Sequence, residues 1–318
     1  MREDDWRPSC SIDALVERSR TLSAIRAFFA QRHVLEVDTP VLSRTTVTEP
    51  AIESLYVVAG SDRLYLQTSP EYQMKRLIAA GAPSIVRIGP VFRAEESGRL
   101  HNPEFTMIEW YRLGFDLARL IGEVEALVDL VLGAARYRHV TYRQLLREGA
   151  GVDPYAASEL DLREALGALG VELSPNAGVS RRDLLDLLVT HAIDATGEGR
   201  VFITDYPEDQ AALARIVTDA DGHSVAKRFE LIVDGVEIAN GYDELVDAEV
   251  LERRMGEDRV IRRRAGREQP DIDGRLLAAM RSGLPSCSGV ALGFDRLLML
   301  KLGVARIDAA MPFGFSRA

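Results

Sequence analysis

The sequence has few of the residues that hold small secreted proteins or metal centres together. Among 318 residues there are only two cysteines, Cys10 and Cys287, and they form no CxxC pair. This count argues against a disulfide framework. The five histidines show none of the spacings typical of a zinc site. A fold based on cross-links or structural zinc is therefore disfavoured.

Long apolar segments are also missing. No uninterrupted run approaches the ~20 residues that a membrane-spanning helix needs, and the apolar stretch 289–303 is broken by Asp295, Arg296 and Lys301. The opening residues, MREDDWRPSC, are polar and acidic and lack the basic-then-apolar layout of a signal peptide. We therefore expect a cytoplasmic protein without a membrane partner.

Positive charge is in deficit, since 39 basic residues face 49 acidic ones and the formal net charge is −10. An acidic chain is a poor electrostatic fit to a polyanion, which disfavours extended nucleic-acid binding. The composition, 47% hydrophobic and 28% charged, is that of an ordinary globular protein. The length allows one large domain or two ordinary ones.

The first third of the chain alternates between helical and extended patterns. Apolar residues recur at helical spacing over 12–32 and predict an amphipathic helix. Extended segments are expected at 34–40 and 84–95, with a helix over 71–80. Residues 104–113 show period-two alternation, which is typical of a strand.

From about residue 114 to 226 the pattern becomes mainly helical, although an extended segment returns at 200–207. A second extended segment covers 227–241, and the stretch 289–300 reads as a strand turning into a helix. Strands, a helical insertion and further strands predict one α+β domain over 1–318 with an antiparallel sheet.

The two strands predicted at 85–95 and 104–112 would be joined by a long hairpin loop. Together they would present cationic, acidic, amide and aromatic side chains: Arg93, Glu95, His101, Asn102, Phe105, Glu109 and Tyr111. An arginine can neutralise a phosphate with two hydrogen bonds, and a phenylalanine face can stack a purine. On alternation alone, however, a merely solvated outer face of the sheet accounts for the pattern better.

A second group of polar residues surrounds the turn Asp234-Gly235, a strong signal for a two-residue hairpin. Such a turn pairs Ile232 with Glu237, which places Glu230 and Glu237 on one face. Two close carboxylates repel each other unless a cation lies between them. Mg²⁺ on a triphosphate is one such cation. Hydrated, exposed carboxylates are the alternative and the commoner case.

The segment GVALGFDRLLML, from Gly289 to Leu300, has small residues at 289, 291 and 293 that would let a ligand approach the backbone. Arg296 would project from the first turn of the following helix. The segment matches neither the phosphate loop nor the dinucleotide fingerprint, so alone it is a weak signal.

In order, these segments resemble the class II aminoacyl-tRNA synthetases, specifically the lysyl branch. The first helix with VLEVDTP is similar to the family's first motif, with Pro40 as its proline. FRAEESGRLHNPEFTMIEWY resembles the second motif, GVALGFDR the third, and VEIANGYDEL the lysyl substrate segment. The resemblance implies an antiparallel sheet flanked by helices, a homodimer, and use of ATP with Mg²⁺.

Two departures narrow the resemblance. The first motif begins near residue 12, so the anticodon-binding domain of lysyl-tRNA synthetases is expected to be absent. Ala291 stands where the tRNA enzymes have glycine. Both departures are similar to features of the truncated lysyl-synthetase paralogues that attach (R)-β-lysine to a lysine ε-amino group of elongation factor P. The segments TSPEYQMKRL and CSGVALG-DRL resemble the same paralogues. The implied partners are elongation factor P and β-lysine, and no tRNA.

The resemblance also assigns roles to residues. The amino-acid carboxylate would attack the ATP α-phosphate, with Arg93 and Arg296 as the catalytic residues. The nucleotide would be bound by Arg93, Ala94, Glu95, His101, Asn102, Phe105, Glu237, Ile238, Gly293 and Arg296. The amino acid would be bound by Ser69, Pro70, Glu71, Glu109, Tyr111, Asn240, Glu244 and Ala291. Mg²⁺ would be held by Glu230 and Glu237.

Two other functions remain open at this stage. One is a small enzyme that adenylates α-lysine or charges tRNA, against which the missing domain argues. The other is an inactive regulatory paralogue. An inactive binder has no need of a full ATP-binding set, and this chain retains Arg93, Glu95, Glu237 and Arg296.

Overall fold

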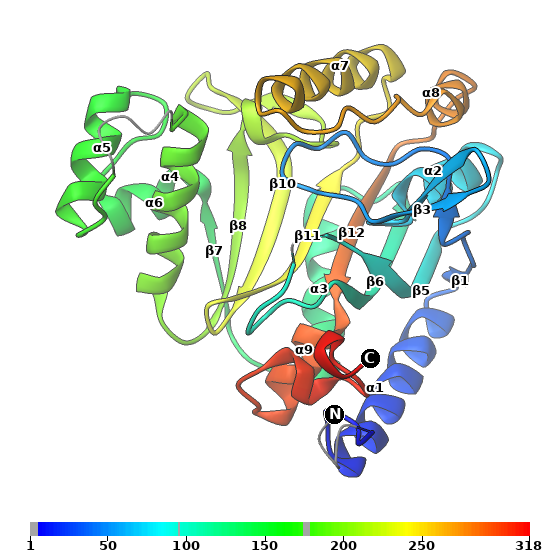
Figure 1. Ribbon diagram of the computed structural model, residues 1–318. Helices are drawn as coiled ribbons and strands as arrows, with labels where there is room; N and C mark the ends of the chain where they lie inside the picture. The colour runs from blue at the N-terminus through cyan, green and yellow to red at the C-terminus, as the bar shows by residue number, and fades with distance from the viewer. Residues whose placement is uncertain (1–5, 95, 174–178) are drawn as a thin grey trace. The chain divides into compact units, whose positions relative to one another are not determined.

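The computed structural model of the chain describes residues 6–94, 96–173 and 179–318, and it divides into two compact units (Figure 1). The first unit comprises the chain up to residue 134 and from 244 onward, and the second comprises 135–243. None of the helices within the described ranges has the length and apolar character that a membrane span requires.

The first unit contains a sheet with the strand order β1 (Leu35–Glu36), β5 (Ile85–Phe92), β6 (Glu104–Leu113) and β12 (Cys287–Gly293). β1 runs parallel to β5, and the other pairs are antiparallel. A smaller antiparallel sheet has the order β2 (Leu42–Ser43), β4 (Asp62–Leu66) and β3 (Tyr56–Ala59). The predicted strand over 104–113 is therefore confirmed.

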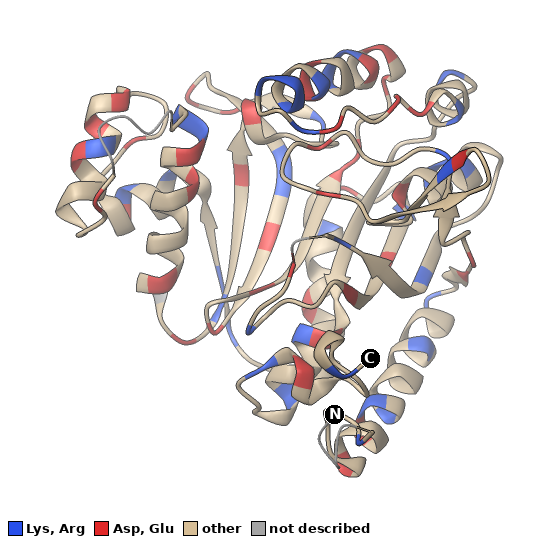
Figure 2. Cartoon of the chain, in the orientation of Figure 1, with Lys and Arg blue, Asp and Glu red and all other residues tan. Residues whose placement is uncertain are grey.

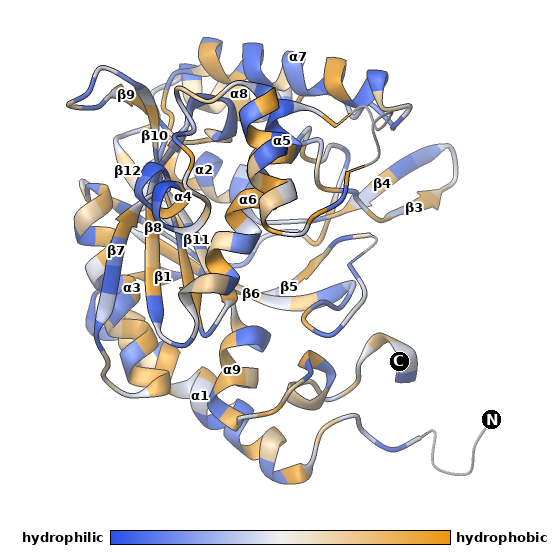
Figure 3. Cartoon of the chain, turned by 90° about the vertical axis from the view of Figure 1, so that its left-hand side faces the viewer, coloured by the Kyte–Doolittle hydropathy of each residue, from blue (hydrophilic) through white to orange (hydrophobic). Residues whose placement is uncertain are grey.

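Helices surround these sheets: α1 (Ile12–Gln31), α2 (Glu71–Ala79), α3 (Leu117–Leu132), α7 (Ala248–Arg264), α8 (Gly274–Arg281), α9 (Phe294–Leu302), and the 3₁₀ turns η2 (Ile307–Ala310) and η3 (Phe315–Arg317). α1 begins at Ser11, whose hydroxyl accepts the Ala14 N–H at 3.1 Å. α7 is amphipathic, with charges of both signs and alternating hydrophobic bands along its length (Figures 2 and 3). It buries Leu251 and Met255.

The central strand β6 is buried on both faces over Met107–Tyr111. On one face, the Trp110 ring packs edge-on against Phe29 of α1, with 5.2 Å between ring centres. On the other face, Glu109 and Tyr111 are both 2% exposed. The alternation in this segment therefore does not mark a solvated sheet face, because both faces are covered.

The second unit has a sheet in the order β11 (Val236–Asp243), β10 (Ser224–Val233), β8 (Arg200–Pro207) and β7 (Tyr137–Thr141), and β9 (Ile216–Thr218) also pairs with β10. β7 runs parallel to β8, whereas β8, β10 and β11 are antiparallel. The extended segment predicted at 200–207 coincides with β8.

The helices of the second unit are α4 (Tyr142–Ala150), α5 (Glu159–Ala168), α6 (Arg181–Thr196) and the 3₁₀ turn η1 (Glu208–Gln210). The three α-helices start with capping boxes at Thr141, Ser158 and Ser180. The stretch 114–226, expected to be a helical insertion, also contains β7, β8 and β9. Its first helix, α3, belongs to the first unit. Whether the two units act as one domain stays a prediction.

The hairpin of β10 and β11 turns at Asp234-Gly235, where both φ angles are positive (49° and 75°). Ile232 pairs with Glu237, as predicted. A bulge follows, in which Leu231 lies opposite Ala239 and the register shifts by one residue. Glu230 consequently pairs with Asn240.

Candidate active site

Two carboxylates meet one lysine in the first unit. Glu71 begins α2, Lys75 follows one turn later, and Glu244 precedes α7. The Lys75 Nζ lies 2.6 Å from Glu71 Oε1 and 2.6 Å from Glu244 Oε2. The side chains of Lys75 and Glu244 are each 1% exposed, so this ion pair is removed from bulk water.

A third carboxylate, Glu109 on β6, is held by hydroxyl groups and lies opposite the buried Arg87 of β5. Its Oε2 accepts a hydrogen bond from the Ser69 hydroxyl, and its Oε1 accepts one from the Tyr111 hydroxyl, both at 2.7 Å. The Ser69 oxygen also accepts the Glu71 N–H at 3.0 Å, which ties the start of α2 to this group. Pro70, at the N-cap of α2, fixes the turn between them.

The electrostatics of these residues favour a cationic ligand. Burial raises the pKa of Glu109 to about 7, and the nearby Glu71 adds to the shift. Burial also raises the pKa of Glu244, to about 8, although Lys75 opposes the shift. For Lys75, burial disfavours the charged amine, but Glu244 and Glu71 outweigh it and hold its pKa above the usual value. An ammonium group entering here would meet carboxylates that are short of positive charge.

Strand β12 lies beside these residues and supplies small side chains. Gly289 is opposite Tyr111, and Ala291 is opposite Glu109. A Cβ added at Gly289 would lie 2.4 Å from the Tyr111 ring and 2.5 Å from Glu244 Oε1. Glycine is therefore required at this position by the close approach of two side chains. Gly293, opposite Met107, ends the same strand.

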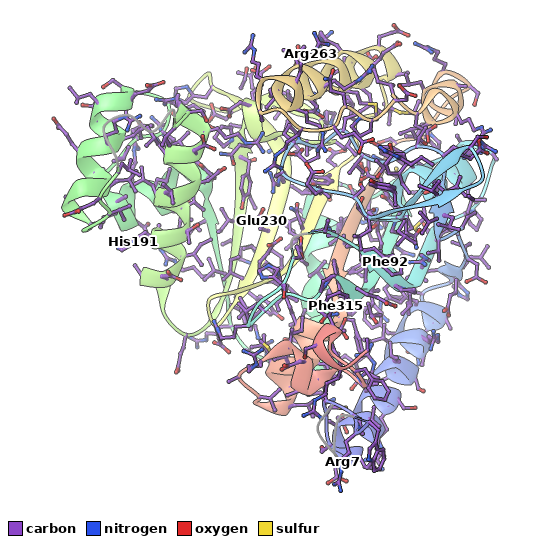
Figure 4. The ribbon with its side chains drawn as sticks, in the orientation of Figure 1. Arg7, Phe92, His191, Glu230, Arg263 and Phe315 are labelled. Carbon is purple, nitrogen blue, oxygen red and sulfur yellow. The ribbon has the colours of Figure 1, made fainter. Side chains whose placement is uncertain are left out.

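Arg93 follows the end of β5, which stops at Phe92 (Figure 4). The predicted strand is thus too long, because Ala94 turns away and donates its N–H to the Glu53 carbonyl at 2.9 Å. The Arg93 guanidinium lies 5.3 Å from the Phe105 ring centre. Its buried Nε has no hydrogen-bond partner among the described residues, and a ligand oxygen would satisfy it. Glu95 lies outside the described residues.

Arg296, in the first turn of α9, contacts the hairpin loop. Its Nη2 is 2.6 Å from His101 Nε2, and its Nε donates to the Leu100 carbonyl at 3.1 Å. Burial, with Arg296 beside it, lowers the pKa of His101 below its usual value. His101 is therefore neutral at pH 7 and can accept a hydrogen bond from Arg296.

The neighbouring Asp295 anchors this helix. Its Oδ1 lies 2.5 Å from Arg18 Nη1 of α1, and its Oδ2 accepts the Thr106 N–H at 2.6 Å. One carboxylate thus joins α1, β6 and α9 directly beside Arg296. Neither Arg18 nor Asp295 was singled out as a site residue from the sequence, since they lie 277 positions apart.

Asn102 uses its amide within the protein. Its Nδ2 donates to the Glu104 carbonyl at 2.6 Å, and its Oδ1 accepts the Phe315 N–H at 2.8 Å. The side chain fixes the hairpin loop to the C-terminal turn. Recognition of adenine by Asn102 stays a prediction.

The acidic residues of the second unit form a separate group around Glu230 on β10 (Figure 4). Arg228 bonds to Glu230 Oε1, and the Asn240 Nδ2 approaches the same oxygen at 3.3 Å. Glu237, which pairs with Ile232, lies on this face as well. Burial raises the pKa of Glu230, Arg228 opposes the shift, and Glu237 adds to it.

Glu230 and Glu237 would bind a cation together with oxygens of a ligand. The described residues contain no set of three or more histidine, cysteine or acidic side chains arranged to bind a metal ion. Mg²⁺ is commonly held by one or two carboxylates together with substrate phosphates. Glu230 and Glu237 fit that requirement, and their role as metal ligands stays a prediction.

The structure brings together most of the predicted amino-acid site: Ser69, Pro70, Glu71, Glu109, Tyr111, Glu244 and Ala291 all belong to the first unit. Asn240 and Ile238 lie on β11 in the second unit, where Ile238 is buried at the bulge. Sequence reasoning missed Lys75 and Arg228. The signal for Lys75 was its position four residues after Glu71, and for Arg228 its position two residues before Glu230 on one strand face.

The whole chain is similar to proteins of one known family. The family described as tRNA synthetases class II (D, K and N) matches residues 5–317. The elongation factor P–(R)-β-lysine ligase of Proteus mirabilis is 44% identical over 99% of this chain and 98% of its own length. The ligase of the same name from Salmonella arizonae is 43% identical over 98% of each chain.

Matches of this extent confirm the resemblance inferred from the motifs and the α+β architecture predicted with it. This family uses ATP. Because the family match covers residues 5–317 and the relatives match almost the whole chain, the chain belongs to the class II tRNA synthetases of the D, K and N group and has their catalytic fold.

Proposed function

We propose that this protein is an ATP-dependent ligase that activates (R)-β-lysine as its adenylate. It then transfers the β-lysyl group to the ε-amino group of a lysine on elongation factor P. The name of the full-length relatives supports both the amino acid and the acceptor. The structural observation that carries the proposal is the group of Glu71, Glu109 and Glu244 in the first unit, of which Glu109 and Glu244 are buried.

A diamino acid fits this group better than any monoamino acid. Burying several carboxylates is unfavourable unless cations accompany them. Lys75 contacts Glu71 and Glu244, whereas Glu109 is bound only by hydroxyl groups. Lysine and β-lysine each bring two ammonium groups, and these would add positive charge beside the carboxylates.

In the first half-reaction, a carboxylate oxygen of the amino acid attacks the α-phosphorus of ATP and pyrophosphate leaves. Such a step depends on alignment and on neutralising the charge that develops on the phosphate. Arg93, with its unsatisfied buried Nε, would contact the α-phosphate. Phe105 would stack on the adenine, and Arg296, positioned by His101, would contact the nucleotide from α9.

Glu230 and Glu237 would hold Mg²⁺ at the phosphate oxygens. The ion, when bound, neutralises phosphate charge. Arg228 binds Glu230 Oε1 and would hold this carboxylate in place for the ion.

In the second half-reaction, the nitrogen of a neutral lysine amine attacks the carbonyl carbon of the adenylate. The amide bond forms, AMP leaves with the bond electrons, and the nitrogen loses a proton. The products are AMP and an isopeptide-linked β-lysyl group on elongation factor P.

ATP–pyrophosphate exchange with (R)-β-lysine, (S)-β-lysine and α-lysine tests the first step. The second step is tested by incubating the enzyme with ATP, (R)-β-lysine and elongation factor P, followed by intact-mass measurement. We expect one β-lysyl addition on a single lysine, and none on elongation factor P whose lysines have been acetylated. Charging of tRNA without a protein adduct would instead identify a tRNA enzyme. Absence of exchange with any amino acid would favour an inactive paralogue.

We also propose that the protein works as a homodimer, as the first motif implies. The first unit has exposed apolar side chains that a second copy could cover: Val16 is 42% exposed, Tyr56 47% and Val58 70%. Light scattering on the purified protein should give twice the chain mass of 35.1 kDa. A mass of one chain at micromolar concentration would contradict this proposal.

A further inference from the structure

Arg262, near the end of α7, is a buried cation that the proposed mechanism does not use. It is 2% exposed, whereas Arg263 and Arg264, which follow it on the same helix, are exposed. Arginine is rarely buried unless its charge and its five N–H groups have partners. The partners of Arg262 therefore indicate what the residue does.

Most of these partners lie in the segment 49–53, between β2 and β3, which is neither helix nor strand. The Arg262 Nη2 donates to both oxygens of the Glu53 carboxylate, each at 2.9 Å. Its Nη1 donates to the carbonyls of Glu49 and Ile52, at 3.0 and 3.1 Å. One guanidinium thus binds the backbone and a side chain of segment 49–53 together.

The remaining N–H of Arg262, on Nε, donates to the Glu268 carbonyl at 2.5 Å, so that every N–H of the guanidinium has an acceptor within the first unit. Arg267 also reaches segment 49–53, where it donates to the Pro50 carbonyl at 2.9 Å. Arg267 is exposed, so water can replace its contacts. Arg262 therefore acts within the protein, and no N–H of its guanidinium is left for a ligand.

Glu53 connects segment 49–53 to Arg93. The Glu53 carbonyl accepts the N–H of Ala94 at 2.9 Å, and the Pro103 carbonyl accepts the N–H of Arg93 at 2.9 Å. These two hydrogen bonds hold the peptide planes on both sides of the Arg93 Cα. Because φ and ψ are the soft torsions of a residue, the two bonds together set the direction in which the Arg93 side chain leaves the backbone.

We propose that Arg262 is a positioning residue for the adenylation step. By holding segment 49–53, it places the Glu53 carbonyl that orients Arg93 toward the α-phosphate. A displacement of about 1 Å at a reacting group can cost on the order of 100-fold in rate. The inference rests on the proposed function, in which Arg93 contacts the α-phosphate.

The test is a double-mutant cycle of Arg262→Met and Arg93→Ala, measured by pyrophosphate exchange with (R)-β-lysine. Arg262→Met alone should lower kcat by about 10-fold to 100-fold, with the KM for β-lysine little changed. In the double variant, the misplaced side chain is already absent. The second substitution should therefore cost no more than about two-fold beyond Arg93→Ala alone.

Arg112→Met is the matched control for the loss of a mostly buried cation in the first unit. The Arg112 Nε lies 3.3 Å from Glu123 Oε2, and its Nη1 donates to the Arg32 carbonyl at 3.3 Å. Both Arg112→Met and Arg262→Met should lower the melting temperature. Only Arg262→Met should lower kcat, at a temperature at which circular dichroism shows all variants folded.

Losses that multiply in the double variant would show that Arg262 and Arg93 act independently, and the inference would be wrong. A wild-type kcat in folded Arg262→Met would also overturn it. Should Arg262→Met not fold, Glu53→Gln takes its place in the cycle, because it removes the charge of the pair and keeps the shape of the side chain.

A wild type that activates no amino acid would instead refute the proposed function. Titration calorimetry with ATP would then decide the inference. Arg262→Met should weaken ATP binding when Arg93 is present and leave it unchanged in the Arg93→Ala background. Equal weakening in both backgrounds, or none in either, would overturn the inference.

Discussion

Ala291 on β12 lies directly opposite Glu109 on β6. Paired residues in an antiparallel sheet project to the same face, with Cβ atoms about 5 Å apart. The Ala291 methyl group therefore occupies space next to a carboxylate of the predicted amino-acid pocket. This is also the position at which the third motif departs from the tRNA enzymes.

Ala291→Gly should raise activity with α-lysine relative to β-lysine by about ten-fold or more. One carbon in a close-packed site discriminates by roughly 1–3 kcal/mol. The amino group of β-lysine is one carbon further from the carboxylate, so the methyl can obstruct α-lysine selectively. The measurement is the ratio of kcat/KM for the two amino acids in pyrophosphate exchange. An unchanged ratio would place the specificity at Ser69, Glu71 and Glu244 instead.

Arg93→Ala should reduce adenylate formation at least ~100-fold, the scale for one lost electrostatic contact in the transition state. Exchange kinetics measure the loss, and circular dichroism confirms that the variant is folded. Near-normal exchange in a folded variant would remove Arg93 from the catalytic assignment.

Gly289→Ala should weaken binding of the amino acid while the protein still folds. The new Cβ would displace the Tyr111 ring or the Glu244 carboxylate, because it would lie within 2.4–2.5 Å of both. We expect kcat/KM for β-lysine to fall by about 100-fold or more.

Gly122→Ala on α3 is the control for that substitution, since a Cβ there meets no atom within 4 Å. It should leave exchange unchanged and stabilise the helix by up to about 1 kcal/mol. Wild-type kinetics in Gly289→Ala would show that Tyr111 and Glu244 can move without loss.

The stability of the ligand-free protein should fall as the pH rises from about 4.5 to about 7. The pKa of Glu109 in the folded state is about 7, against a reference value of 4.5. Its contribution is therefore fully present below pH 4.5 and is lost as the pH rises through about 7. Thermal unfolding should show a decrease of a few degrees over this range, reduced in Glu109→Gln and reversed by β-lysine. A melting temperature that is equally pH-dependent in both proteins would assign the effect to other groups.

The sequence predicted long, strongly patterned elements well. The helix over 12–32, the strand over 104–113 and the hairpin turn at Asp234-Gly235 have local causes, namely periodicity and turn chemistry. The bulge at Ile238 has no such local signal, because β11 contains no glycine at the bulge. The predicted regular pairing therefore misplaced Asn240 relative to Glu230.

Site residues that lie within sequence motifs, such as Glu71, Glu109 and Arg93, could be predicted from the sequence. Site residues that are identified only by their tertiary contacts could not be predicted. Lys75 reads as an ordinary helical residue until Glu244, 169 positions later, is seen beside it. The use of the Asn102 amide by the backbone of Glu104 and Phe315 likewise follows from the fold alone.

The discontinuity of the first unit has a consequence for synthesis of the chain. The second unit is one continuous stretch, 135–243, and holds its own apolar core, so it can fold while the chain is still being made. The first unit cannot be completed until its last segment leaves the ribosome. Arg18, made near the start, must wait for Asp295, and Asn102 must wait for Phe315. During that interval β6 has no β12 to pair with along its edge, and the residues of α1 and β6 that contact α9 stay uncovered.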